Sequence, residues 1–248
     1  MRDTLHRPWP LPSTPWVMTQ TWHDLLFAHW PLEAAVVRAL VPPQLPLDTF
    51  DGRAWIGIVP FTMSRVGPRF VPALPWLSAF PEINVRTYVT VGGRPGVYFF
   101  SLDATNPVAV RAARLLYRLP YFTASIAVAR EGDRIVYRSR RQSRPDAAFD
   151  ASYAPSGPAF QAQDGSLDYF LTERYCLYTA GHRVSRTDIH HPRWTLQRAE
   201  AEIRAHTIAA AAGLPPLPAA PHLLFSRRQD TVAWLPTRVT MPPITEAP

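Results

Sequence analysis

Regular alternation of polar and apolar residues is the clearest pattern in this chain, and it predicts a fold built mainly of strands. Between residues 82 and 91 every second side chain is polar, and the side chains between them are apolar or β-branched. Because successive side chains of a strand point to opposite faces, this segment predicts a strand with one polar face. That face consists of Glu82, Asn84, Arg86 and Tyr88. A glycine pair at 92–93 predicts a turn into a returning strand at 96–103.

Prolines and glycines divide the rest of the chain into short segments. The 28 prolines and 11 glycines are spread throughout, which favours many short strands over long helices. Helices are expected at 32–41, from a cap at Thr105 or Asn106 to Pro120, and after Ser166. Residues 142–165 predict a long loop, and residues 196–212 predict either a helix or a strand followed by a helix. Further strands are expected at 20–30, 55–63, 121–129, 134–141, 175–179, 183–190, 222–226 and 231–235.

The chain contains no linker that would separate two domains. We therefore expect one domain over residues 16–237, with a Pro-rich arm at 1–15 and a Pro-rich tail at 238–248. The succession of short strands predicts a mainly β (α+β) domain. Its antiparallel sheet is expected to be curved or barrel-like and to carry a few short helices.

The basic residues are all arginine, and this restricts the chemistry. The sequence holds 26 basic residues and no lysine, a bias that GC-rich coding explains better than any function does. Schiff-base catalysis by a lysine amine and a Walker-type phosphate loop are nevertheless excluded. The net charge of +7 brings nucleic acid into consideration. The arginines are scattered and no nucleic-acid-binding motif is present, so the sequence disfavours that partner.

The remaining composition argues against disulfides, metals and membranes. The single cysteine, Cys176, rules out an internal disulfide framework and reads as a small buried hydrophobe. His190 and His191 are adjacent, and on a strand they would point to opposite faces. His23 and His29 would share a strand face about 20 Å apart, too far to bind one ion. We expect no metal and no cofactor, and the lack of a long apolar run predicts a cytoplasmic protein without a transmembrane helix.

The polar face at 82–88 is the most informative candidate site. Inside a barrel it would form a wall that binds an anion or a carbonyl group, with Arg86 gripping a carboxylate and Glu82 acting as an acid or base. The alternative is a solvated outer face of an antiparallel sheet. Arg174 could reach across a pocket, or it could form a structural ion pair with Asp168 or Glu82.

Several separate blocks of the sequence resemble the uncharacterised DUF2071 (YqjF-like) family. The resemblance spans residues 16–236 and keeps the order of the blocks, although the family has no established activity. The blocks are FAHWPL (27–32), LDTFDGRAWIGIVPF (47–61), PEINVRTYV (81–89), GVYFFSLDA (96–104), ARLLYRLPY (113–121), SLDYFLTERYCLY (166–178) and IHHPRW (189–194).

That family looks like a branch of the acetoacetate decarboxylase-like superfamily. The resemblance implies antiparallel sheets curled into a barrel-like cone around a central cavity. In the decarboxylases a cavity lysine forms a Schiff base with a β-keto acid, and a second lysine lowers its pKa. The nearest local match places Tyr121 and Phe122 at the two lysine positions, so that mechanism does not carry over. Glu82 would match a cavity glutamate of the decarboxylases.

Two functional hypotheses follow from these observations. In the first, the cavity binds a small anionic or carbonyl-bearing molecule and performs cofactor-free acid–base chemistry of the lyase or isomerase type. Glu82 is then the catalytic candidate, and the ligand-binding candidates are Arg86, Tyr88, Tyr121 and Arg174. In the second, the domain binds a ligand or a protein without catalysis. The superfamily resemblance also leaves room for a homo-oligomer.

Overall fold

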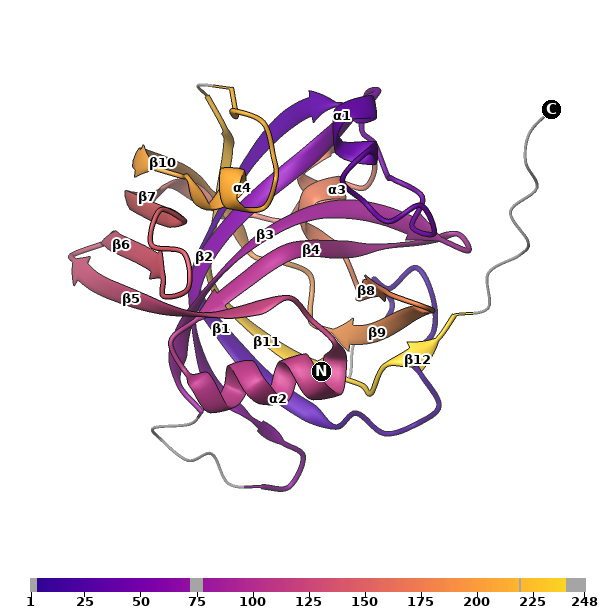
Figure 1. Ribbon diagram of the computed structural model, residues 1–248. Coiled ribbons are helices and arrows are strands. Elements are labelled where there is room, and N and C mark those ends of the chain that lie inside the picture. Colours follow the sequence, from indigo (N-terminus) through magenta and orange to yellow (C-terminus); the bar gives the residue numbers. More distant parts are fainter. Residues whose placement is uncertain (1–3, 72–77, 219, 240–248) are drawn as a thin grey trace.

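Twelve strands form one continuous sheet in the computed structural model, which describes residues 4–71, 78–218 and 220–239 (Figure 1). The strands are β1 (Met18–Glu33), β2 (Arg53–Pro68), β3 (Phe80–Val91), β4 (Arg94–Ala104), β5 (Tyr121–Glu131), β6 (Arg134–Arg141), β7 (Ala148–Phe160), β8 (Cys176–Ala180), β9 (Val184–His190), β10 (Leu196–Ala205), β11 (His222–Ala233) and β12 (Thr237–Arg238). The helices of the described residues are α1 (Ala34–Arg38), α2 (Pro107–Tyr117), α3 (Leu167–Thr172) and α4 (Ile208–Ala211).

The sheet curls until it meets itself in two places. Its strand order is β12-β9-β8-β4-β3-β2-β1-β11-β10-β7-β6-β5, and β4 also pairs with β5 while β9 also pairs with β11. The pairs β4–β5 and β4–β8 are parallel, and the other strand pairs of the described chain are antiparallel. The predicted class, a mainly β fold with barrel-like curvature, is therefore confirmed.

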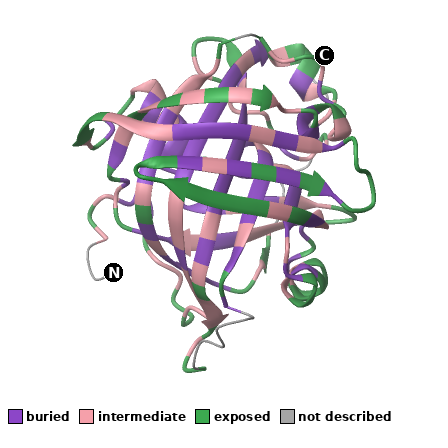
Figure 2. Cartoon of the chain, turned by 90° about the vertical axis from the view of Figure 1, so that its left-hand side faces the viewer, coloured by how far each residue is buried: buried purple, intermediate pink, exposed green. Residues whose placement is uncertain are grey.

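The β4–β5 and β9–β11 closures form two rings that share strands β1 to β4 and β11, and these shared strands are covered on both faces. One face of β3, with Ile83 and Val85, packs into a core that also contains Tyr137 and Phe149 from β6 and β7. The outer strands alternate instead: in β6 every second residue is buried. Figure 2 shows this contrast, because the strands nearest the viewer carry exposed residues and those behind them are mostly buried. The opposite face of β3 is enclosed as well, since Glu82 and Asn84 on that face are buried.

Helix α2 begins and ends where local chemistry predicts. The Asn106 side chain caps its start by accepting hydrogen bonds from the amides of Val108 and Ala109, at 3.0 and 3.1 Å. Pro107 occupies the first turn, where its missing N–H is not needed. Arg118 ends the helix in a left-handed conformation, and Pro120 follows.

Two predicted segments are wrong, and a third is decided between its two alternatives. Residues 142–165 contain strand β7, whose Pro155 and Gly157 imitate a loop although β6 and β10 pair with its two edges. Residues 196–212 form a strand and then the short helix α4, which is the second of the two alternatives. Residues 222–233 form one long strand rather than two, because the polar run in its middle stays paired with β1 in an unbroken register.

A β-bulge in β1 corrects a further expectation. Asp24 has a positive φ of 50°, and the register with β2 shifts between His23 and Ala28. One extra residue reverses the alternation, so Trp22 and Leu25 face the same side. His23 and His29 therefore lie on opposite faces, and each bonds a separate partner, Ser64 for His23 and Tyr88 for His29.

The two terminal segments are partly described. In the arm, Trp9 is buried in the main core, and Thr14 accepts a hydrogen bond from the Trp234 indole at 2.6 Å. Residues 1–3 of the arm and residues 240–248 of the expected tail lie outside the described residues. No helix that the structure describes is long and apolar enough to cross a membrane.

A buried ion pair near the β4–β5 closure leads to a stability prediction. Arg141 donates two hydrogen bonds of 2.8 Å to the carboxylate of Asp103, and both residues are buried. We expect Asp103→Asn to lower the free energy of unfolding by about 3–5 kcal/mol, since it leaves a buried guanidinium without its counter-charge. Denaturant unfolding measures this. Glu33→Gln is the control, because its pair with Arg53 is exposed and is worth at most about 1 kcal/mol. Equal losses in both variants would contradict the prediction.

Candidate ligand-binding cavity

A cavity of about 500 Å³ lies on the enclosed face of β3. Strands β1, β2, β3, β4, β8, β9 and β11 contribute to its wall, and helix α2 covers one side. Most of the lining is apolar; its larger side chains include Trp22, Phe61, Met63, Phe80, Phe99 and Trp194. Such a cavity, apolar with a few polar groups, is typical of a binding site for a small organic molecule.

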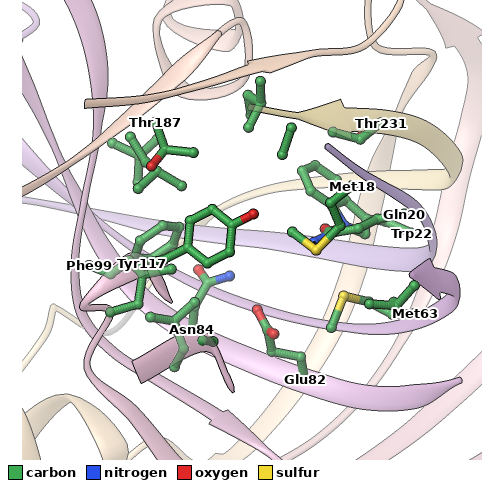
Figure 3. A pocket seen from close by; sticks show the side chains of 18 of the residues that line it. Met18, Gln20, Trp22, Met63, Glu82, Asn84, Phe99, Tyr117, Thr187 and Thr231 are labelled. Carbon is green, nitrogen blue, oxygen red and sulfur yellow. Dashed lines mark hydrogen bonds between the residues drawn. The ribbon is translucent and has the colours of Figure 1, made fainter. Parts of the chain in front are cut away.

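The polar face of β3 points into this cavity. Glu82, Asn84 and Arg86 all line it, because they alternate with the core residues of the same strand. Figure 3 shows the Glu82 and Asn84 side chains entering the cavity from one wall, with Thr187 and Thr231 on the opposite side. The sequence left open whether this face meets solvent or the interior of the protein, and in the structure it lines an interior cavity.

Glu82 is a buried carboxyl group with no cationic partner among the described residues. Only 3% of the residue is exposed. The hydroxyl of Tyr121 donates to Glu82 Oε2 at 2.7 Å, and the Asn84 side chain also hydrogen-bonds it. Burial raises the pKa of Glu82 to about 7 against these two hydrogen bonds, and the nearby Asp103 raises it further. The group therefore exchanges its proton near neutral pH.

Arg86 supplies a positive charge that no carboxylate of the described chain neutralises. Its guanidinium lies 5.4 Å from the ring centre of Phe27 and 5.8 Å from that of Tyr88. Nη2 makes one long bond of 3.4 Å to the carbonyl of Leu171, and Nε has no hydrogen-bond partner in the described structure. Arg86 thus retains donors for an anion.

Gly57 lets the side chains of His29 and Arg86, from the strands on either side of β2, approach each other. It pairs with His29 of β1 and with Arg86 of β3. A Cβ atom on Gly57 would lie 2.6 Å from His29 Nε2 and 3.3 Å from Arg86 Cγ, so a larger residue would push the two side chains away. Burial, together with the charge of Arg86, holds the pKa of His29 well below its usual value and keeps this imidazole neutral.

Tyr88 and Arg174 are differently placed from the other candidates. Tyr88 is fully buried behind the cavity wall, where its hydroxyl donates to the Leu171 carbonyl at 2.7 Å and bonds His29 Nε2 at 2.6 Å. Arg174 lines the cavity, but its ion pair is with Asp48, at 2.7 Å, and not with Asp168 or Glu82 as the sequence suggested. Glu82 and Tyr121 therefore meet on the cavity wall, Arg86 lines the same wall, and Tyr88 does not line the cavity.

Three further lining residues carry buried polar atoms without a partner in the described structure. These atoms are Asn84 Oδ1, Trp194 Nε1 and Thr231 Oγ1. Unsatisfied buried polar atoms are rare, and in a cavity they mark positions where a ligand or water bonds. The sequence pattern singles out only Asn84, because it shares the polar face of β3. Trp194 and Thr231 reach the cavity through tertiary folding, and nothing local distinguishes them from core residues.

Metal-ligating and thiolate chemistry have little support within the described residues. No group of three or more His, Cys, Asp or Glu side chains is arranged to hold an ion there. Burial lowers the pKa of His191, which lines the cavity, to about 4. Burial raises the pKa of the Cys176 thiol to about 12, so the thiolate is absent at neutral pH.

The closed sheet with its enclosed cavity is an acetoacetate decarboxylase-like fold. The fold is similar to that of acetoacetate decarboxylase from Legionella pneumophila, with a TM-score of 0.64 and 12% identity, covering 95% of this chain and 93% of that one. It is also similar to the enduracididine biosynthesis enzyme MppR complexed with pyruvate, with a TM-score of 0.63 and 11% identity, over 96% and 95% of the two chains. At such identities the likeness concerns the fold alone.

The chain belongs to the DUF2071 family of uncharacterized conserved proteins, whose model matches residues 19–230. It is 47% identical over 225 residues to the uncharacterized protein YqjF of Bacillus subtilis (strain 168), covering 90% of this chain and 93% of that protein. The family resemblance inferred from the sequence blocks is confirmed.

The raised pKa of Glu82 couples stability to pH. The carboxyl titrates with a pKa of 4.5 when unfolded and about 7 when folded, so the unfolded state releases its proton first as the pH rises. The stabilising contribution is therefore complete below about pH 4.5 and is lost by about pH 7, a change of roughly 3 kcal/mol. We expect the difference in unfolding free energy between the wild type and Glu82→Gln to fall by roughly 3 kcal/mol between about pH 4.5 and pH 7. Urea unfolding of both proteins at a series of pH values measures this difference. A difference independent of pH would contradict the assignment, because every other titrating group is common to both proteins.

Proposed function

We propose that this protein binds a small organic carboxylate or carbonyl compound in the cavity and exchanges protons with it through Glu82. The observation that carries the proposal is the buried Glu82–Tyr121 pair, facing a cavity and bearing a pKa of about 7. A general acid or base works best when its pKa lies near the operating pH. A carboxyl group with such a pKa, placed in a cleft, is a candidate for catalysis.

The chemistry that fits this pair is proton removal next to a carbonyl group. The ionised Glu82 carboxylate would take the proton from the carbon, the C–H electron pair would form a C=C bond, and the π pair of the carbonyl group would move to its oxygen to give an enolate. The protonated Glu82 would then return the proton, so the reaction is an enolisation or part of an addition or elimination. Tyr121 donates to Glu82 Oε2 and orients it throughout.

Arg86 supports a carboxylate as the anionic part of the ligand. Its guanidinium lies in the cavity wall with an unused donor and without a counter-ion in the described chain. The fold relatives support the same ligand class, since one is named acetoacetate decarboxylase and another is described with pyruvate bound. The sequence has no lysine, so no lysine Schiff base assists the reaction.

Binding is the first part to test, with pyruvate and acetoacetate as probes. At about one hundred times its dissociation constant a ligand stabilises the folded protein by about 2.7 kcal/mol, which raises the melting temperature of a chain this size by about 5–10 °C. We expect Arg86→Met to remove this shift, because the carboxylate loses its charged donor. Arg53→Met is the control, because Arg53 is exposed at the start of β2 and away from the cavity, and this variant should keep the shift. A shift that survives in Arg86→Met would refute the role of Arg86.

Proton exchange tests the catalytic part. In D₂O the wild-type protein should exchange the hydrogens beside the carbonyl of a bound keto acid, as NMR detects. The rate should rise with pH through about 7, since Glu82 acts as a base only when ionised. Glu82→Gln should slow exchange by about 10²–10⁴-fold, whereas the exposed Glu131→Gln should not. Binding with no exchange above the solution rate would instead favour a non-catalytic ligand-binding domain.

A further inference from the structure

We infer that the cavity takes an extended carboxylate, with its anionic head between Arg86 and Trp194 and an apolar chain running past Glu82 to a mouth beside α2. This inference rests on the proposed function for the location of the site. It adds the orientation and the length of the ligand, which the Glu82–Tyr121 pair alone does not give.

The head position is supported by two buried donors that share one aromatic neighbour. The Arg86 guanidinium lies 5.4 Å from the centre of the Phe27 ring, and the Trp194 indole meets the same ring edge-on at 5.0 Å. Arg86 Nε and Trp194 Nε1 are both buried, and neither has a hydrogen-bond partner in the described structure. Both residues line the cavity. Two N–H donors, one of them charged, suit a carboxylate with its two acceptor oxygens.

The side chains around these donors are buried. Leu171, His191 and Trp194 line the cavity, and all three are buried. His191 stays neutral at physiological pH, because burial lowers its pKa to about 4. Arg174 also lines the cavity, but Asp48 already pairs with it. Within the described wall, Arg86 is thus the cation left for a ligand.

The distance along β3 favours a ligand longer than a short keto acid. Arg86 and Glu82 are four residues apart, and β3 pairs with β2 from Phe80 to Arg86 without a register shift. Their Cα atoms are therefore about 13 Å apart. The Arg86 guanidinium lies near two rings, Phe27 at 5.4 Å and Tyr88 at 5.8 Å. A ligand with its carboxylate at Arg86 and an extended chain spans this separation and passes Glu82.

The mouth of the cavity is apolar. Val108 and Leu116 of α2 and Leu235 after β11 line the cavity, although they are 54%, 62% and 56% exposed. Between them, Ala109 and Ala113 present small side chains to the interior, which leaves room for a chain to pass under the helix. An anionic head is not stabilised at such an apolar rim, whereas a hydrocarbon chain is stabilised there by burying apolar surface.

The middle of the cavity also suits a flexible chain. Met18, Trp22 and Met63 gather on the side of the cavity next to Glu82 in Figure 3. Methionine side chains adapt to ligands of irregular shape. The volume of about 500 Å³ falls in the range that holds drug-sized molecules, well above the need of a compound with a few carbons.

A chain-length series tests this inference by calorimetry. The probes are straight-chain carboxylates of about four to fourteen carbons and the matching primary alcohols. We expect the dissociation constant to fall about fourfold for each added methylene until the chain fills the cavity, and then to level off. Arg86→Met should weaken every acid by at least about tenfold and leave the alcohols unchanged. Trp194→Phe keeps an aromatic ring and removes the N–H donor, and it should also weaken the binding of the acids.

A substitution at the mouth tests the direction of the chain. Ala113→Phe places a ring in the path under α2 and should shorten the chain length at which the gain stops. Leu115→Phe, on the exposed side of the helix and away from the cavity, is the matched control and should leave that length unchanged. Circular dichroism identifies any variant that fails to fold.

The possible outcomes separate this inference from the proposed function. If short keto acids bind through Arg86 and longer chains gain nothing, the extended ligand is wrong and the proposed site stands. If affinity grows with chain length but does not respond to Arg86→Met or Trp194→Phe, the cavity binds chains and the anion end is wrong. If no carboxylate of any length binds the wild-type protein, both fail.

Discussion

Enclosure of β3 on both faces is the constraint on which the rest of the site depends. A strand with one apolar and one polar face would normally turn the polar face to water. Here the sheet closes around it, so ionisable groups are removed from solvent and each must be paired, neutral or available to a ligand. The structure contains all three solutions. Asp103 pairs with Arg141, Glu82 holds its proton up to about pH 7, and Arg86 keeps a charge with no carboxylate partner among the residues that the structure describes.

Part of this site could be predicted from the sequence because it is local. Alternation alone placed Glu82, Asn84 and Arg86 on one face of a strand, and the Asn106 cap with Pro107 gave the helix that covers the cavity. The same alternation describes a sheet face in water, so it could not decide between interior and exterior. That decision depends on the β4–β5 and β9–β11 closures, which join segments far apart in the chain.

The remaining features could not be predicted, because tertiary contacts override local signals. Pro155 and Gly157 read as loop residues, yet the strand that contains them is held by partners on both edges. The bulge at Asp24 changes which β1 side chains face the cavity and has no sequence signal of its own. Trp194 is an ordinary core residue by pattern, and only its unpartnered indole nitrogen distinguishes it.

The order of charges along the cavity links ligand binding to proton uptake. A carboxylate is attracted by Arg86 and repelled by Glu82 whenever Glu82 is ionised, which favours one orientation of the ligand. An apolar chain that passes Glu82 also displaces water from it, and further desolvation raises the pKa of a carboxyl group. Glu82 in the complex is then protonated more often but is a stronger base when it is ionised. A lysine at the position of Tyr121 would reverse this relation, because an ammonium group beside Glu82 would lower its pKa and keep it charged. The tyrosine hydroxyl donates a hydrogen bond without adding a charge, so the carboxyl group retains a pKa near neutrality in the absence of any lysine.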